Sequence, residues 1–462
     1  MTPSRCFAFS IATLIAMSTT PACVSTPEPE ASDESFEGDA LVVAESVSDG
    51  DTLAQRLSEL FLVEHTTVAL SPGMAKMMAT SPPGGLVFWN LGRGTVSDLR
   101  ETIRAYEAAR VRAGRPRILY STDYEGGGQS YTTRGSFNAG VQRFITGMTS
   151  LAHPRWIGLA YRRNHAVGEE LATLHGKLMA QELASVGINY PLATVSDLAE
   201  GLFVNRSVDV DPAVVAPLVA RMYDGYASVP GGIFVTKHFP GLGQTTGDTH
   251  EGLVVSKVTD PAIAGRHLRP FSELIDHSSA SPFRLSVLCG HAKYPLYDSI
   301  QQTTVSEPIL KGLLRGPKVQ FQGLSLSDAM WMGPYGTMPT SALFRVYVHA
   351  TLSGMDMLMI PGFRYGAALS YFRKVYNGTL SLDEQALLSA KVGLRWPELR
   401  ATFKARAAES QARFDAAREV IGDVRSALES PGSTPKDRTQ LNRARYQELL
   451  RQTDPAWASK SL

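Results

Sequence analysis

Residues 233–250 read IFVTKHFPGLGQTTGDTH, and this stretch predicts a buried strand followed by a long loop. Four apolar or β-branched residues, 233–236, form the strand, and Lys237 and His238 follow it directly. Pro240 and three glycines then give the loop access to unusual backbone angles and the freedom to move. In a parallel α/β fold, polar residues at the carboxyl end of a strand are typical of the active-site rim.

The same alternation of short apolar runs and longer amphipathic stretches continues on both sides, which is the pattern of repeated βα units. Candidate strands cover residues 67–70, 85–89, 118–122, 189–192, 233–236, 285–289, 324–327 and 357–360, with helices between them such as 96–113 and 167–186. Eight strands over about three hundred residues predict an α/β fold in the form of a closed (β/α)8 TIM barrel. An open doubly wound sheet is the alternative, but no GxGxxG follows the first strand.

Polar residues follow directly on several predicted strands, namely Asp123, Lys237 with His238, His291, and Asp328. The carboxyl ends of barrel strands meet at one mouth, so we expect these side chains to converge there. Taken alone, Asp328 is better explained as the N-cap of a following helix. Several strand ends with such residues favour a single active site at the mouth.

Composition excludes several classes of function. The 462 residues are 44% apolar and 19% charged. The 45 Lys and Arg against 44 Asp and Glu leave a net charge of +1, and the sequence has no basic stripe that would bind nucleic acid.

Cys289 lies in an apolar run, which predicts a buried, inert thiol rather than a reactive one. His153, His165 and His175 have no ligand spacing, and HExxH and paired CxxC motifs are missing, so we expect no metal or other cofactor.

The first residues predict export. Residues 6–17 form an apolar run too short to span a bilayer, and Arg5 is the charge before it, so residues 1–22 are predicted to be a signal peptide. The segment before Cys23 resembles a lipoprotein cleavage site, although Thr20 stands where an aliphatic residue is usual. A lipidated Cys23 would anchor a periplasmic or cell-envelope protein, for instance in the outer membrane. Cleavage with release of a soluble protein is the alternative.

Two segments flank the predicted barrel domain, 52–398. Residues 23–51 are rich in Ser, Pro, Glu and Asp, which predicts a flexible tether. Residues 399–462 predict a C-terminal helical extension, with helices near 401–429 and 438–452 separated by a Pro-Gly-Ser-Thr-Pro break. We expect these helices to pack on the outside of the barrel, and a partner-binding or cell-wall-binding role is the alternative.

The stretch from Lys237 to His250 resembles the signature of glycoside hydrolase family 3 in its β-N-acetylglucosaminidase (β-hexosaminidase) branch, approximately KHFPGHGxxxxDSH. The spacing from Lys237 to Asp248 and His250 is kept, with Leu242 where the family usually has His and Thr249 where it commonly has Ser. Residues 84–88, 123–127, 205–207, 289–291 and 321–330 resemble further family segments in the same order. The resemblance covers residues 53–362.

The resemblance implies a catalytic set. Asp328 would be the nucleophile and His250 the general acid/base, assisted by Asp248, in the two-step mechanism of retaining glycosidases. A carboxylate beside an imidazole can set its tautomer and stabilise its protonated form. Without the resemblance, an Asp-x-His pair is a weak signal and is usually a surface loop feature.

The resemblance also implies substrate-binding residues. Asp123 would accept hydrogen bonds from sugar hydroxyls, and Arg206, Lys237 and His238 would donate them, because charged partners make the stronger hydrogen bonds. The family usually has Arg five and eight positions after this Asp, where the present chain has Gly128 and Tyr131. Arg134 is the candidate replacement.

The function implied is that of a retaining exo-β-N-acetylhexosaminidase, which releases terminal β-linked N-acetylglucosamine from peptidoglycan fragments or chitooligosaccharides. Family 3 β-glucosidases and β-xylosidases typically carry the acid/base on a second α/β domain, which we do not expect after residue 362. Two alternatives stay open. A phosphorylase would use the same residues, because a neutral imidazole repels phosphate less than a carboxylate does. A catalytically weak, anchored glycan-binding lipoprotein is favoured by Leu242 and the missing Arg residues.

Overall fold

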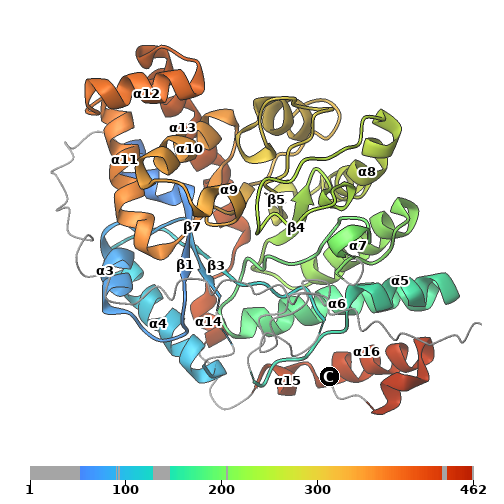
Figure 1. Ribbon diagram of the computed structural model, residues 1–462. Coiled ribbons are helices and arrows are strands. Elements are labelled where there is room, and N and C mark those ends of the chain that lie inside the picture. The colour runs from blue at the N-terminus through green and yellow to red at the C-terminus, as the bar shows by residue number, and fades with distance from the viewer. Residues whose placement is uncertain are drawn as a thin grey trace, which may run out of the picture.

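The computed structural model describes residues 52–89, 91, 94–127, 146–203, 206–428 and 434–459. Within these residues, seven parallel strands form one sheet in the order β3-β2-β1-β7-β6-β5-β4. They are β1 Phe61–His65, β2 Gly85–Phe88, β3 Leu119–Ser121, β4 Phe234–Phe239, β5 Leu285–Cys289, β6 Ser325–Ala329 and β7 Met357–Ile360. The chain is therefore an α/β protein, and its sheet is the strongly curved, parallel part of a barrel-like fold (Figure 1).

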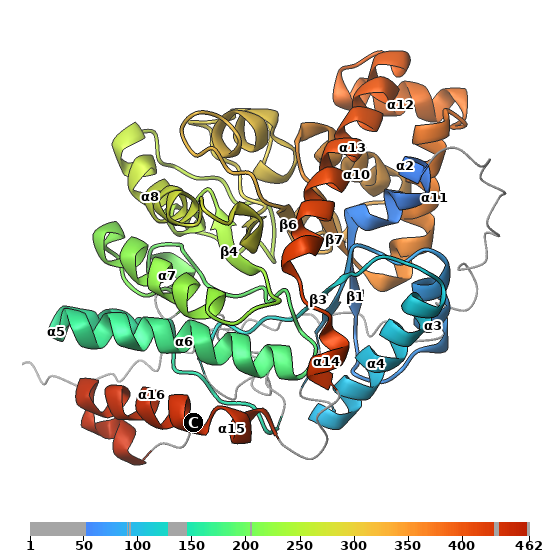
Figure 2. The ribbon, with the colours of Figure 1, turned by 180° about the vertical axis from the view of Figure 1, so that it is seen from behind.

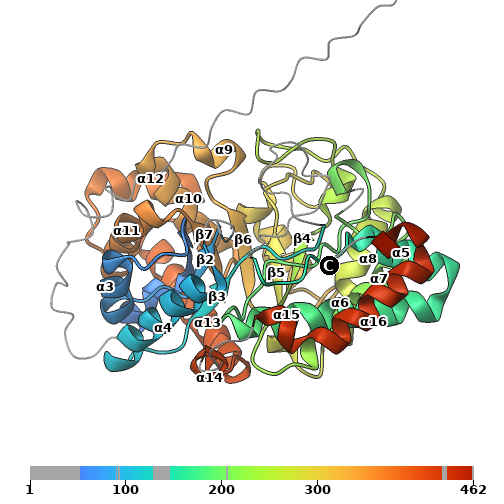
Figure 3. The ribbon, with the colours of Figure 1, turned by 90° about the horizontal axis from the view of Figure 1, so that it is seen from below.

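Helices surround this sheet. Figure 3 shows the strands in the middle, with α3, α4, α10 and α11 on one side and α5 to α8 on the other. The main helices are α3 Pro72–Thr80, α4 Val96–Arg112, α5 Pro154–Arg163, α6 His165–Ser185, α7 Pro212–Ala227, α8 Pro261–His277, α10 Thr340–Ser353, α11 Tyr365–Asn377, α12 Leu382–Val392, α13 Trp396–Val420 and α16 Gln440–Thr453. Shorter ones are α2 Thr52–Gln55, α9 Gly333–Gly336, α14 Val424–Leu428 and α15 Pro435–Arg438. Among the helices described, none combines the length and the hydropathy that a membrane-spanning segment requires.

Local sequence explains where many helices begin. Ser71, Asp211 and Asp260 each accept a hydrogen bond from the first turn of α3, α7 and α8, and proline follows each of them at the first helical position. Such a cap satisfies a backbone N–H that has no partner within the helix, and proline there gives up an N–H that would also lack one.

Alternate strand residues divide the core in two. Leu62, Val87 and Leu326 are buried inside the curve of the sheet, whereas their neighbours Phe61 and Val63 pack outwards against the helices. This division follows from the two-residue period of a strand, and it explains why the strands read as continuous apolar runs.

The strand predicted at 67–70 is wrong, because the chain forms β1 at Phe61–His65 instead. The Thr67 hydroxyl accepts a hydrogen bond of 3.2 Å from the Ala69 amide, which makes a local turn. Leu70 is 50% exposed, and Ser71 then caps α3. Residues 61–63 form the buried strand in place of 67–70 because they are apolar on both faces.

Residues 189–192, also predicted as a strand, do not form a regular one in the structure. Their backbone nevertheless forms hydrogen bonds on both sides: the Leu192 amide donates to Thr122 O, just after β3 (2.9 Å), and the Ile233 amide, just before β4, donates to Asn189 O (2.9 Å). Pro191 has no N–H to donate, and Thr194 has a positive φ of 62°, so a continuous ladder cannot form. Segment 189–196 thus lies between β3 and β4.

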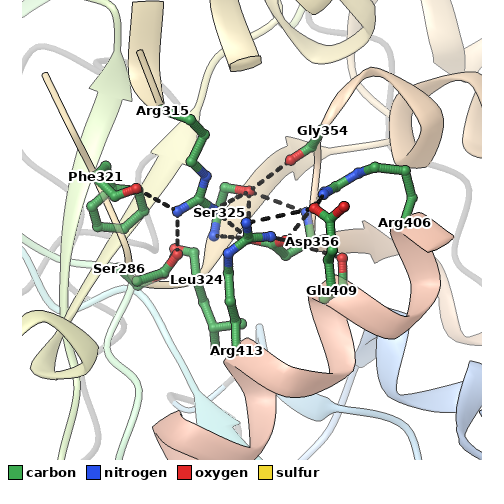
Figure 4. A network of polar contacts seen from close by, with 12 residues as sticks. Ser286, Arg315, Phe321, Leu324, Ser325, Gly354, Asp356, Arg406, Glu409 and Arg413 are labelled. Atoms are coloured by element: carbon green, nitrogen blue, oxygen red, sulfur yellow. Dashed lines mark hydrogen bonds and ion pairs between the residues drawn. The ribbon is translucent and has the colours of Figure 1, made fainter. Parts of the chain in front are cut away.

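Helix α13 closes the amino-terminal end of the sheet, where Phe414 joins the inner core. Figure 4 shows how it is held: the buried Asp356 carboxylate, beside the start of β7, accepts hydrogen bonds from Arg315 (2.5 Å) and Arg413 (2.8 Å). Burial alone would raise the pKa of Asp356, but the nearby arginine charges hold this pKa below its usual range. The boundary predicted after residue 398 falls within α13.

Candidate active site

The carboxyl end of β4 carries a buried lysine. Lys237, predicted to follow the strand, is one of its residues, and its Nζ lies 3.0 Å from Asp123 Oδ1 and 2.6 Å from Glu125 Oε1. It also donates to Leu192 O at 2.7 Å. Burial alone would lower the pKa of Lys237, but the two carboxylates raise it above its usual value. The ammonium therefore stays charged and joins β4 to the segment after β3.

Arg206 completes this charge cluster. Its Nε and Nη2 donate to the two oxygens of Glu125 at 3.0 and 2.8 Å, in the planar two-bond geometry that suits a guanidinium and a carboxylate. Burial alone would raise the pKa of Glu125, but Arg206 and Lys237 lower it to about 2. The two carboxylates thus neutralise the two cations, and all four side chains are buried. Glu125 stands in the motif at 123–127, yet the sequence analysis gave it no role.

Asp197 holds His238. The Asp197 Oδ2 atom lies 2.7 Å from His238 Nδ1 and accepts the His238 amide at 3.0 Å. Sequence reasoning missed Asp197, although it follows closely on a predicted strand as the other rim residues do. Because its carboxylate binds Nδ1, the Nε2 atom of His238 is the one left to contact a substrate.

Leu242, the departure from the family signature, is part of the same arrangement. Its amide donates to Asp197 Oδ1 at 2.5 Å, and its side chain is 4% exposed within the outer core. The backbone of the loop is therefore held at this position by a bond that any residue except proline could make. Leucine adds apolar packing where histidine is usual.

His250 and Asp248 form the expected pair on the loop after β4. The Nδ1 atom of His250 lies 2.6 Å from Asp248 Oδ1, which also accepts the His250 amide at 2.9 Å. The His250 side chain is 40% exposed and that of Asp248 18%. Burial alone would raise the pKa of Asp248, but hydrogen bonds and charge from His250 lower it.

Asp328 lies within β6 rather than after it. Its Oδ1 accepts the Ala329 amide at 2.8 Å. Burial alone would raise the pKa of this carboxyl, but the imidazoles of His238, His291 and His250 nearby, together with the hydrogen bond from the Ala329 amide, hold it below its usual range. The structure therefore brings β4, the segment after β5 and the loop of His250 together around one ionised carboxylate.

His291 supports the strand that carries Asp328. Its Nε2 donates to Ala329 O at 2.9 Å, and its Nδ1 lies 2.7 Å from Thr304 Oγ1. Burial lowers the pKa of His291, which favours the neutral ring. Both ring nitrogens are engaged, so this side chain orients its neighbours rather than contacting a substrate.

Two tryptophans that were not among the predicted site residues lie at the same end of the sheet. Trp89 follows β2 and Trp331 lies just beyond β6, with ring centroids 5.7 Å apart in an edge-to-face arrangement. Both are half-buried and pack on the inner core. Each tryptophan lies two positions after an inward-facing strand residue, Val87 or Ala329, and this spacing could have predicted that both rings face the inside of the curved sheet. An aromatic surface next to buried charges can contact the apolar face of a polar ligand.

Residues 59–390 match the model of the glycosyl hydrolase family 3 N terminal domain. The chain belongs to glycosyl hydrolase family 3. It is therefore a glycoside hydrolase, and the predicted family is confirmed. Among curated relatives, a beta-hexosaminidase of Thioalkalivibrio sulfidiphilus is 30% identical over 346 residues, which is 72% of this chain and 89% of that protein. One of Hydrogenovibrio crunogenus is 31% identical over 251 residues, 53% of this chain and 63% of the relative.

Solved structures of family 3 share the fold. A β-N-acetylglucosaminidase from Paenibacillus sp. str. FPU-7 has a TM-score of 0.67 and 21% identity, covering 86% of this chain and 69% of that one. NagZ from Neisseria gonorrhoeae has a TM-score of 0.57 and 22% identity, covering 79% of this chain and 98% of that one.

Some predicted residues of this family 3 enzyme cannot be placed. Arg134, with Gly128 and Tyr131, lies outside the described residues, and so does Cys23. In the part of the chain that the structure describes, no three His, Cys, Asp or Glu side chains are grouped so that they could hold a metal ion. Cys289 is fully buried in β5, and burial raises the pKa of its thiol.

Proposed function

We propose that this family 3 enzyme is a retaining exo-β-N-acetylhexosaminidase, which hydrolyses terminal β-linked N-acetylglucosamine from peptidoglycan fragments or chitooligosaccharides. The observation that carries the proposal is the Asp248–His250 pair, whose loop the Gly333 amide joins to the segment after Asp328 through the His250 carbonyl. A carboxylate nucleophile and an imidazole acid/base from one rim suffice for both steps of the reaction. The beta-hexosaminidase relatives point the same way.

In the first step, the Asp328 carboxylate attacks the anomeric carbon while His250 protonates the departing glycosidic oxygen. The lowered pKa of Asp328 keeps it ionised, as a nucleophile must be. Because His250 Nδ1 faces Asp248, the proton moves through Nε2. In the second step, His250 takes a proton from water, whose oxygen attacks the anomeric carbon and breaks the ester to Asp328. Two inversions retain the β configuration.

The buried charge cluster binds the terminal sugar in this proposal. Asp123 accepts hydrogen bonds from ring hydroxyls, and Lys237, Arg206 and His238 donate to others. Their partners Glu125 and Asp197 hold the donors in place before the sugar arrives, which reduces the ordering that binding requires. Trp89 and Trp331 offer apolar surface to the sugar ring or its acetyl group.

We further propose a full (β/α)8 barrel over residues 52–398, with segment 189–196 as the eighth strand. Its hydrogen bonds to Thr122 and to Ile233 on opposite sides support this closure. The helices of residues 399–462 are proposed to form an extension of this barrel. Residues 1–22 would be a signal peptide and 23–51 a tether, so that lipidation of Cys23 anchors the enzyme in the periplasm or cell envelope.

One assay series tests the activity. The purified enzyme is incubated with aryl β-N-acetylglucosaminide and with aryl β-glucoside, with and without phosphate, and the products are identified. Release of β-N-acetylglucosamine from the first substrate alone, without need of phosphate, is the expected result. Sugar 1-phosphate would identify a phosphorylase. Binding of N-acetylglucosamine without turnover would identify a glycan-binding protein and overturn the proposed hydrolase.

A further inference from the structure

The last helices of the chain, α15 and α16, lie outside the family segment 59–390, yet they pack against α6, which contacts residues 123–127 (below, the sugar-binding loop). Figures 1 and 2 both show α15 and α16 alongside α6. Helix α6 lies between them and residues 123–127, the segment after β3. Tyr446 of α16 is fully buried in this contact.

Tyr446 reaches the loop through a histidine of α6. Its hydroxyl lies 2.9 Å from His175 Nδ1, and both side chains are buried. His175 also forms a hydrogen bond with the backbone of Glu125, and Tyr446 with the backbone of Ala152. The Tyr446 hydroxyl thus connects α16 with α6, and the His175 ring extends this connection to the backbone of Glu125 in the charge cluster.

The direction of these bonds is determined by chemistry. Burial lowers the pKa of His175 to about 4, so the ring is neutral near pH 7 and carries one N–H. The bond with the Glu125 backbone favours the protonated ring, as a bond to a carbonyl acceptor does, so this N–H points to Glu125. The Nδ1 atom must then accept the Tyr446 proton. Loss of the hydroxyl would leave Nδ1 buried without this donor.

Residues 126 and 127 lie directly against this contact. A Cβ atom added to Gly126, whose φ is +91°, would lie 2.5 Å from Ala152 O and 3.0 Å from His175 Cε1. The Gly127 amide donates to Leu151 O at 2.9 Å. Backbone of residues 151–152 and the His175 ring therefore hold the two glycines that follow Glu125.

A second contact from the same helices reinforces the first. Thr439, just before α16, donates to Glu182 Oε1 at 2.8 Å. The same Glu182 carboxylate accepts the Thr149 amide at 2.6 Å, and Tyr124 OH donates to Thr149 O at 2.7 Å. Tyr124 and Gly126 flank Glu125 in the sequence. They contact Glu182 and His175 of α6, and the C-terminal helices bind the same two side chains.

We propose that Tyr446 is a positioning residue, which acts through His175 to keep Glu125 where it binds Lys237 and Arg206. The C-terminal helices are then part of the sugar-binding machinery rather than a passive cover. This inference rests on the proposed function for its kinetic consequence, but not for its structural one.

The test compares Tyr446→Phe, which removes one hydroxyl, with Arg445→Gln on the same helix. Arg445 makes an exposed ion pair with Glu170 of α6 and does not reach the loop. Tyr446→Phe should raise KM for aryl β-N-acetylglucosaminide about fivefold, as expected for one buried hydrogen bond, with kcat within twofold. Arg445→Gln should change neither. Amide hydrogen exchange in residues 123–127 should become faster in Tyr446→Phe only.

Thr439→Val provides an independent variant if Tyr446→Phe folds poorly, and it should also speed exchange in 123–127. A lower melting temperature in Tyr446→Phe with unchanged KM and unchanged exchange in this segment would overturn the proposal, since that is the behaviour of a purely structural contact. If the wild-type enzyme has no activity, the proposed function fails. The exchange comparison still decides whether Tyr446 holds the loop.

Discussion

The Gly333 amide donates a hydrogen bond of 3.1 Å to the carbonyl oxygen of His250. Gly333 stands at the start of α9, shortly after β6 and Asp328, so this bond joins the two segments that carry the proposed acid/base and nucleophile. The approach is close: a Cβ atom at Gly333, whose φ is +46°, would lie 2.5 Å from Thr249 O. Glycine is required here by both the backbone angle and the space.

Gly333→Ala should therefore displace the His250 loop and lower kcat about tenfold, because small errors in the placement of catalytic groups have large effects on rate. KM for the aryl glycoside should change less. Gly265→Ala is the matched control, since a Cβ atom there meets nothing within 4 Å. Equal kcat in both variants would show that the two segments are not coupled.

Asp328→Asn should abolish nearly all turnover, with a loss on the order of a thousandfold or more, because an amide is a poor nucleophile. A slowed, fluorinated substrate should trap a glycosyl ester on Asp328 in the wild type and none in the variant. N-acetylglucosamine should still bind through Asp123, Lys237 and His238, as calorimetry can check. Peptide mapping that places the ester on Glu125 or Asp248, or a product of inverted configuration, contradicts the assignment.

Asp248→Asn should leave the fold intact but remove the charge that orients and stabilises the His250 imidazolium. Substrates with poor leaving groups need proton donation, so their kcat/KM should fall about a hundredfold. Activated aryl glycosides should lose less than about tenfold. An equal loss on both types would assign Asp248 to binding or to loop structure instead.

Glu125 should make stability depend on pH. Its pKa falls from 4.5 to about 2 in the folded protein, so the unfolded chain binds the proton more readily. The stability it contributes is present above pH 4.5 and is lost as the pH falls towards 2. Glu125→Gln should show a smaller drop in melting temperature between pH 6 and 3 than the wild type. If the melting temperatures of both proteins fall equally with pH, Glu125 has the same pKa in the folded and the unfolded state.

Cys23→Ser tests the proposed anchor. Expressed with its full leader, the wild-type enzyme should be found with the membrane fraction, carrying lipid on Cys23, because a diacylated residue binds membranes stably. The variant should carry no lipid and move to the soluble fraction. Identical soluble fractionation of both proteins would rule out a lipoprotein.

Local sequence was sufficient for much of the fold. Residues 285–289 and 357–360 are strands where predicted, because a run that is almost entirely apolar can only be stable when both faces are buried. The helix expected at 96–113 forms at Val96–Arg112, since Thr95 and Asp98 make a capping box at its start. The Asp248–His250 pair is equally local, as the two residues are two positions apart.

Tertiary structure decided what depends on distant partners. Segment 189–196 bonds to the chain on both sides although Pro191 and the positive φ of Thr194 interrupt its ladder, and 67–70 lost its predicted strand to the more deeply buried β1. Asp197 and His238 are 41 positions apart, and Glu125 and Arg206 are 81 apart. Apolar periodicity and caps act within a few residues and can be read from the chain. A buried charge instead needs a partner in space, and only the folded sheet determines which residue that is.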